Sequence, residues 1–149
     1  MAVPVSLPSP LEGARAHDFH ALRLARVVDE TADARSFVLE VPDDLRDSFR
    51  YDAGQFCTFR ATIDGREVVR CYSMSSSPHS AEPGSADAPA TSLTTSLTTT
   101  VKRVPDGVMS NWMIDTLEPG TTIEAMRPSG LFVLQPRTAA TPIVAPATI

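Results

Sequence analysis

The stretch QFCTFRATIDGREVVRCYSMS, residues 55–75, decides the fold of this chain. Apolar and polar side chains alternate along its first half, which is the pattern of a half-buried strand over 55–63. The side chains on the apolar face are Cys57, Phe59, Ala61 and Ile63. Asp64-Gly65 follows and predicts a tight turn, because glycine accepts the positive φ that hairpin turns require. With a return strand over 67–75, the stretch indicates an antiparallel hairpin.

Further strand-like runs lie on both sides of this hairpin. The other predicted strands cover residues 22–30, 36–41, 97–104, 121–126 and 131–134. One short helix is predicted over 111–117, with Ser110 as its N-cap and Trp112, Met113 and Leu117 facing inward. Many short strands with a single late helix favour an all-β fold. We expect a six-stranded antiparallel Greek-key barrel with one short helix.

Two segments break this pattern of regular elements. Residues 1–20 carry Pro, Ser, Ala and His without periodicity and predict a flexible leader. Serine and threonine dominate residues 75–100, with prolines between them, which predicts a mobile insertion at about 79–96. The sequence therefore predicts one domain over 21–136.

Composition excludes several classes of protein. The chain has 149 residues and a formal net charge of −5, which argues against a nucleic-acid surface. No apolar run approaches the roughly 20 residues that cross a bilayer, and no secretory signal is present, so we expect a cytoplasmic protein without a membrane partner.

The reactive side chains of the sequence form no catalytic or metal-binding motif. Cys57 and Cys71 cannot supply the four thiolates of a zinc or iron–sulfur site. Both cysteines are predicted as small buried side chains, with a redox role as the alternative. No hydrolytic motif is found, so neither a metal site nor a catalytic residue is predicted.

Two segments combine groups that bind phosphate and groups that stack on rings. In Arg70-Cys71-Tyr72-Ser73, the strand period places Arg70 and Tyr72 on one face. Residues 107–110 lead into the helix, whose first N–H groups lack intrahelical partners and favour an anion. An anionic, ring-bearing cofactor would satisfy both segments. The alternatives are packing or surface roles for Arg70 and Tyr72, and an ordinary helix start.

The order of the motifs resembles the flavin-binding barrel of the ferredoxin–NADP reductase superfamily. In chain order, the motifs are Arg70-Cys71-Tyr72-Ser73, Thr100-Val101-Lys102-Arg103-Val104, Gly107-x-x-Ser110-Asn111-Trp112 and Pro128-Ser129-Gly130-Leu131-Phe132. Three segments look most similar to the reductase components of oxygenases of the 3-ketosteroid 9α-hydroxylase type. They are Val27-Val28-Asp29-Glu30-Thr31 with Ala34-Arg35-Ser36, Tyr51-x-x-Gly54-Gln55-Phe56, and Val101-Lys102-Arg103 through Ser110-Asn111-Trp112. The resemblance covers about 22–134.

This resemblance implies that the chain binds FAD. It implies that Arg70 contacts the pyrophosphate, that the Tyr72 ring lies against the isoalloxazine, and that Ser73 lies near the reactive flavin nitrogen. Main-chain groups of 100–102 would run along the cofactor, and 107–110 would donate N–H groups to the phosphates, with Gly107 allowing a close approach. The predicted cofactor-binding residues are Arg70, Cys71, Tyr72, Ser73, Thr100, Val101, Lys102, Gly107, Val108, Met109, Ser110 and Asn111.

The resemblance also implies a role in electron transfer. Members of the family pass electrons from NADH through FAD and an iron–sulfur centre to an oxygenase, here in steroid or aromatic catabolism. Full-length members add a nicotinamide-binding domain and a [2Fe–2S] ferredoxin domain, so the expected partners are those domains or an oxygenase component. Residues 137–149 resemble the start of the nicotinamide domain, which predicts a truncated chain that binds neither NADH nor 2Fe-2S. The alternative is a non-catalytic flavin-binding or remnant barrel module.

Overall fold

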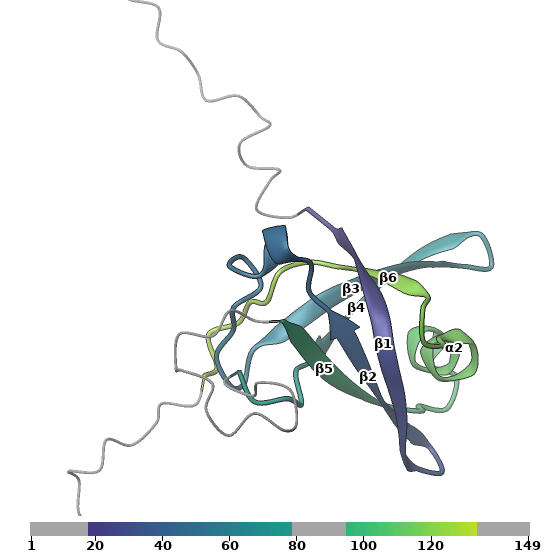
Figure 1. Cartoon of the computed structure of the whole chain (residues 1–149). Coiled ribbons are helices and arrows are strands. Elements are labelled where there is room, and N and C mark those ends of the chain that lie inside the picture. Colours follow the sequence, from purple (N-terminus) through teal and green to yellow (C-terminus); the bar gives the residue numbers. More distant parts are fainter. Residues whose placement is uncertain (1–17, 79–94, 134–149) are drawn as a thin grey trace, which may run out of the picture.

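The computed structural model describes residues 18–78 and 95–133 of the chain (Figure 1). The strands are β1 (His20–Thr31), β2 (Ala34–Glu40), β3 (Phe56–Ile63), β4 (Arg66–Ser73), β5 (Ser96–Lys102) and β6 (Thr122–Ala125), and the helices are the short 3-10 turn η2 (Asp43–Leu45) and α2 (Val108–Thr116). Within these described ranges, no helix has the length and apolar character that a membrane span requires.

The predicted hairpin is formed by β3 and β4. The two strands pair antiparallel from Phe56 opposite Ser73 to Ile63 opposite Arg66. Asp64 and Gly65 make the turn with φ values of 51° and 74°, so both residues have the positive φ that two-residue hairpin turns use. The hairpin prediction is confirmed.

The strands form one antiparallel sheet in the order β4-β3-β6-β1-β2-β5. The pairs β2–β5 and β3–β6 join strands that are distant in sequence, which gives the predicted Greek-key order. The predicted six-stranded antiparallel barrel with one helix is confirmed, but the sheet does not close. Between β4 and β5, the backbone pairing of the described residues is limited to the isolated bridge of Met74 with Thr99 and a 2.8 Å bond from the Ser75 N–H to the Thr98 carbonyl.

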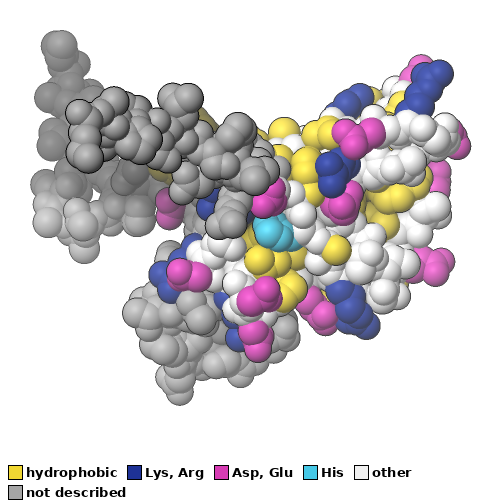
Figure 2. Space-filling model, turned by 90° about the horizontal axis from the view of Figure 1, so that it is seen from above, with side chains coloured by type: hydrophobic (Ala, Val, Ile, Leu, Met, Phe, Trp, Pro, Cys, Tyr) yellow, Lys and Arg dark blue, Asp and Glu magenta, His cyan; other side chains and the backbone are white. Residues whose placement is uncertain are grey.

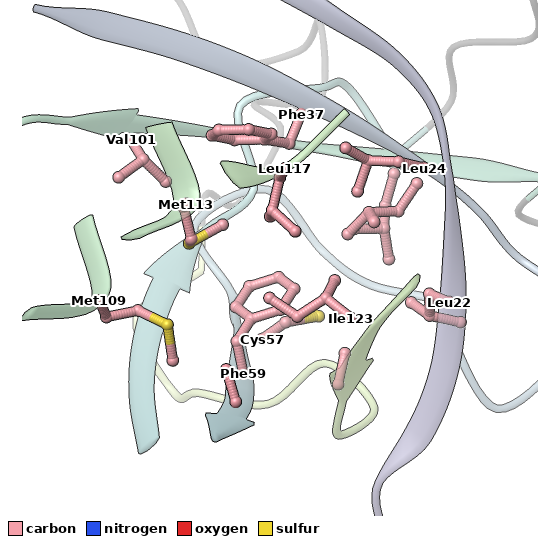
Figure 3. Close-up of a cluster of buried hydrophobic side chains, with 14 of the residues drawn as sticks. Leu22, Leu24, Phe37, Cys57, Phe59, Val101, Met109, Met113, Leu117 and Ile123 are labelled. Carbon is pink, nitrogen blue, oxygen red and sulfur yellow. The ribbon is translucent and has the colours of Figure 1, made fainter. Parts of the chain in front are cut away.

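The core lies inside this curved sheet and is capped by α2. The labelled side chains of Figure 3 come from β1, β2, β3, β5, β6 and α2, with Leu117 from the end of α2, and point toward one another. Phe37, Phe49 and Phe59 are its largest fully buried side chains. Burying a side chain of this size stabilises the fold by about 1.5–3 kcal/mol. In Figure 1, α2 lies below the β3–β4 hairpin, against one end of the barrel.

On the face drawn in Figure 2, acidic and basic side chains are interspersed, and no broad patch of one sign is visible there. Ion pairs join Arg23 to Glu40 at 3.0 Å and Arg46 to Asp43 at 2.6 Å. These exposed pairs contribute little to stability, about 0–1 kcal/mol each.

The helix starts three residues earlier than predicted. Its N-cap is Gly107, and α2 begins at Val108, so the prediction of Ser110 as the N-cap is wrong. Asp106 has a φ of 61°, and the turn it forms brings the chain back over Val104. Ser110 is therefore buried within the first turn, where its hydroxyl oxygen accepts a 3.3 Å bond from the Val104 N–H.

The strand predicted over 131–134 is not formed by its described residues, 131–133. Pairing ends at Ser129, which exchanges two backbone bonds with Phe56, at 2.9 and 3.0 Å. Gly130 then turns the chain with a φ of 122°. Beyond it, Leu131 and Phe132 are 101% and 91% exposed, although their apolar side chains had indicated a buried strand.

At one boundary each, the predicted leader and the predicted insertion overlap a strand of the structure. β1 begins at His20, inside the leader assigned to 1–20, because His20 pairs with Ala125 of β6. β5 begins at Ser96, the last residue of the insertion assigned to 79–96, because Ser96 pairs with Glu40 of β2. Residues 1–17, 79–94 and 137–149 lie outside the described residues, so those assignments stay predictions.

The two cysteines have opposite environments. Cys57 is buried in the core as predicted, and burial raises the pKa of its thiol to about 12. Cys71 is exposed, so its predicted burial is wrong. It lies directly opposite Thr58 on the outer face of the hairpin, with the two side chains 3.3 Å apart.

We therefore expect only Cys71 to react rapidly when the folded chain is treated with a thiol reagent near neutral pH. Thiolate is the reactive form, and Cys57 is both shielded and held protonated. A colorimetric thiol titration checks this, with Cys71→Ser expected to abolish the native signal and denaturant to release that of Cys57. Rapid labelling of folded Cys71→Ser would contradict the described burial.

Candidate functional site

The candidate site begins with β4, a strand that has no buried residue. Arg70 lies opposite Phe59, and Tyr72 lies opposite Cys57. Side chains directly opposite each other in an antiparallel pair share a face of the sheet. Arg70 and Tyr72 thus project together on the face that holds the core of β3, as the strand period predicts.

Tyr72 is the aromatic anchor of this face. Its ring centroid is 6.1 Å from that of buried Phe59, with an interplanar angle of 48°. Burial raises the pKa of the Tyr72 hydroxyl, and nearby Arg70 lowers it by a smaller amount. The side chain is half-buried, so it is held on one side by the core and remains available to a ring on the other.

Ser73 is joined to β5 by hydrogen bonding. The Thr99 hydroxyl donates to the Ser73 carbonyl at 3.0 Å, next to the bridge between Met74 and Thr99. This places the end of β4 beside the predicted residues Thr100 to Lys102. Val101 is buried, so only its main chain is available to a ligand. The Lys102 ammonium lies 3.7 Å from a carboxylate oxygen of Asp33.

Hydroxyl groups form a row on the outer face of β2 and β5. The Ser36 hydroxyl donates to Glu30 at 2.7 Å and lies 2.7 Å from the Thr100 hydroxyl. The Thr100 hydroxyl is in turn 2.7 Å from that of Ser75. This row was not predicted from the sequence, because it depends on the pairing of Ser36 with Thr100 across two strands that are distant in the chain.

The start of α2 supplies backbone donors. The N–H groups of Val108, Met109 and Ser110 precede the first intrahelical bond, which runs from Asn111 to Gly107 at 3.3 Å. No side chain caps this end, and its first turn has no acidic residue. α2 packs against β3, β4 and β5, so these donors lie at the end of the barrel that the helix covers.

A side chain at Gly107 would crowd neighbouring atoms of the chain. A Cβ atom on Gly107 would lie 2.5 Å from the Ser110 hydroxyl and 3.0 Å from the Val104 carbonyl oxygen. Its φ of −71° is ordinary, so the cost of a side chain here comes from these contacts and not from backbone conformation. The sequence suggested a different reason for a glycine at this position, namely that the backbone could approach a phosphate closely.

Gly107→Ala is expected to lower the free energy of unfolding by about 1–2 kcal/mol, because the Ser110 hydroxyl must leave the Val104 N–H. Urea unfolding measures the effect. In a Ser110→Ala background the same substitution should cost less, since the closest contact is gone. Equal losses in the two backgrounds would contradict this contact as the cause.

The donor set fits a ligand with both an anionic and an aromatic part. Arg70 offers a guanidinium, which donates within the chain to the Val69 carbonyl at 2.7 Å, and Tyr72 offers a ring. The start of α2 adds N–H groups suited to phosphate oxygens. The side chains of Val101 and Met109 are buried, so these two residues can contact a cofactor only through their main-chain groups. The Asn111 side chain is bonded to Arg103 and to the Val104 carbonyl.

Comparison with known proteins agrees with this geometry. Residues 21–134 match the family described as oxidoreductase FAD-binding domain. The ferredoxin reductase component of 3-ketosteroid-9-alpha-monooxygenase from Rhodococcus rhodochrous is 46% identical over 112 residues, which are 74% of this chain and 28% of that protein. The corresponding component from Mycolicibacterium smegmatis is 43% identical, over 75% of this chain and 29% of that protein.

A solved structure has the same fold. The ferredoxin reductase in carbazole 1,9a-dioxygenase matches with a TM-score of 0.60 and 26% identity, over 82% of this chain and 32% of that one. The chain thus spans less than a third of the length of the curated relatives described above.

Proposed function

Because this chain belongs to the family of oxidoreductase FAD-binding domains, we propose that Arg70, Tyr72 and the start of α2 hold FAD for electron transfer. Two observations together carry the proposal. The face of β4 that bears Arg70 and Tyr72 has no buried residue, and no side chain caps the three N–H groups at the start of α2. One part of this set suits a ring, and the other suits a pyrophosphate. Both lie at the end of the barrel that α2 caps.

Each group has a distinct role in this proposal. The Arg70 guanidinium forms charge-assisted hydrogen bonds to the pyrophosphate, and the N–H groups of 108–110 bind its other oxygens. The Tyr72 ring packs against the isoalloxazine, while Ser73 and the main chain of 100–102 border its polar edge. When bound, FAD supplies the redox chemistry, and the protein sets its position and electrostatic environment.

The wider role is electron transfer in an oxygenase system. We assign the domain to a cytoplasmic route that runs from NADH through FAD and a [2Fe–2S] centre to an oxygenase acting on steroid or aromatic compounds. Support comes from relatives that are ferredoxin reductase components of 3-ketosteroid-9-alpha-monooxygenase. The partners in this proposal are nicotinamide-binding and ferredoxin domains, or the oxygenase component itself.

Calorimetric titration of the full chain with three flavins tests the proposal. FAD should bind more tightly than FMN, and FMN more tightly than riboflavin, because each step removes phosphate groups that Arg70 and α2 would bind. Equal affinities for all three would contradict the pyrophosphate site. Failure of every flavin to bind a folded chain would favour the remnant-barrel alternative.

A further inference from the structure

We propose that Arg103 is a positioning residue that fixes the first turn of α2 for the pyrophosphate of FAD. This inference rests on the proposed function and adds a residue outside the predicted site. Arg103 follows β5 directly and precedes the turn that leads into α2. It is therefore placed to set the angle at which the helix leaves the sheet.

The Arg103 guanidinium is committed to two side chains of α2. Its Nη2 donates to Asp115 Oδ1 at 2.6 Å, and its Nη1 donates to Asp115 Oδ2 at 3.3 Å. The same Nη1 donates to Asn111 Oδ1 at 3.0 Å. These contacts join one guanidinium to two successive turns of the helix. A bidentate fork restrains orientation as well as distance.

The sheet end of this connection is also fixed. The Arg103 N–H donates to the Asp33 carbonyl at 2.6 Å, in the turn between β1 and β2. A surface pocket lies beside α2, and its lining includes Asp33, Lys102, Asn111 and Asp115. Arg103 thus links the β1–β2 turn to the helix through its own backbone and side chain.

A second set of contacts carries this restraint to the first turn of α2. Asn111 Nδ2 donates to the Val104 carbonyl at 3.2 Å, and the Gly107 N–H donates to the same oxygen at 2.9 Å. The Val104 N–H donates to the Ser110 hydroxyl at 3.3 Å. Arg103 therefore holds Asn111, and Asn111 helps to hold the loop of residues 104–107. This loop leads directly into the first turn of α2, whose N–H groups would bind the pyrophosphate.

Arg103 acts in this account through protein groups and not by touching FAD. Its hydrogen bonds lower the pKa of the Asp115 carboxyl. Removing the guanidinium would leave the fold intact, because the Arg103 and Asp115 side chains are 38% and 62% exposed and a pair this accessible to water contributes little to stability. The expected effect is that the N–H groups of residues 108–110 no longer keep the orientation that the pyrophosphate requires.

The test compares Arg103→Leu with Arg60→Leu in the full chain. Arg60 makes a similar fork to Glu124, at 2.9 and 3.0 Å, on β3 and β6. Its side chain is 31% exposed and that of Arg103 is 38% exposed, so Arg60→Leu is a matched control. FAD and riboflavin affinities are measured for wild type and both variants by flavin fluorescence, and stability by urea unfolding.

Arg103→Leu is expected to weaken FAD binding about tenfold, as for one hydrogen bond to a charged group, and to leave riboflavin binding unchanged. Arg60→Leu should leave both affinities unchanged. The double variant Arg103→Leu/Asp115→Leu should regain stability relative to Arg103→Leu while its FAD affinity stays low.

Three results would overturn the positioning role. These are unchanged FAD affinity in Arg103→Leu, equal losses for FAD and riboflavin, and equal losses in the Arg103 and Arg60 variants. Failure of wild type to bind FAD would instead contradict the proposed function, so the two failures are distinguishable.

Discussion

Arg70→Ala is expected to weaken FAD binding about thirtyfold, because a hydrogen bond between charged groups contributes ~1.5–3 kcal/mol. Arg70 is an exposed cation on the same face of β4 as Tyr72. In the proposed site it is the side chain that pairs with the pyrophosphate. Its loss should therefore affect FAD strongly and riboflavin little. Titration with each flavin, followed by fluorescence, measures the two affinities.

The control for this prediction is Arg60→Ala. Arg60 also lies on the hairpin, but its guanidinium is paired with Glu124 on β6. This substitution removes the same charge from the chain while the proposed phosphate contacts remain. Equal FAD affinities for Arg70→Ala and Arg60→Ala would remove Arg70 from the site.

Phe59→Ala is expected to lower the free energy of unfolding by about 3–5 kcal/mol, the range for truncating a buried aromatic side chain. Phe59 is fully buried and contacts the Tyr72 ring. The substitution leaves a cavity in the core and also removes the support beneath the predicted ring-stacking residue. Urea unfolding of the full chain measures the loss.

Phe132→Ala is the matched control for the core prediction. It removes the same aromatic ring from a position that is 91% exposed. We expect its free energy of unfolding to stay within about 0.5 kcal/mol of wild type. Similar losses for the two phenylalanine variants would contradict the described core.

The hairpin was predictable because its signals are local. Alternation placed Cys57 and Phe59 on one face, and Asp64-Gly65 fixed the turn and hence the register. Residues 131–134 show where such signals fail. Their apolar composition indicates a strand, but Gly130 turns the chain away from the sheet, and Leu131 is left exposed. Tertiary pairing, not local composition, decided that segment.

The candidate site was predictable in part for the same reason. Arg70 and Tyr72 are two residues apart on one strand, so the strand period alone gave their shared face. The role of Arg103 was not predictable, because its partner Asp115 is defined only when α2 packs beside β5. Ser110 was predicted as the N-cap but lies within the first turn of α2, and its contact with the Val104 N–H was not visible in the sequence.

The predicted superfamily is confirmed by the match of residues 21–134 to oxidoreductase FAD-binding domains. The individual residue roles remain proposals. They share one requirement, which is that the folded chain holds FAD. The most direct measurement is the visible absorbance spectrum of the purified chain, taken before and after FAD is added and the excess is removed by gel filtration.

A retained flavin spectrum, perturbed from that of free FAD and close to one equivalent per chain, is the predicted result. It would show that the folded chain holds the cofactor, which every proposed residue role requires. A chain that stays folded by circular dichroism but elutes colourless after FAD has been added would contradict the account.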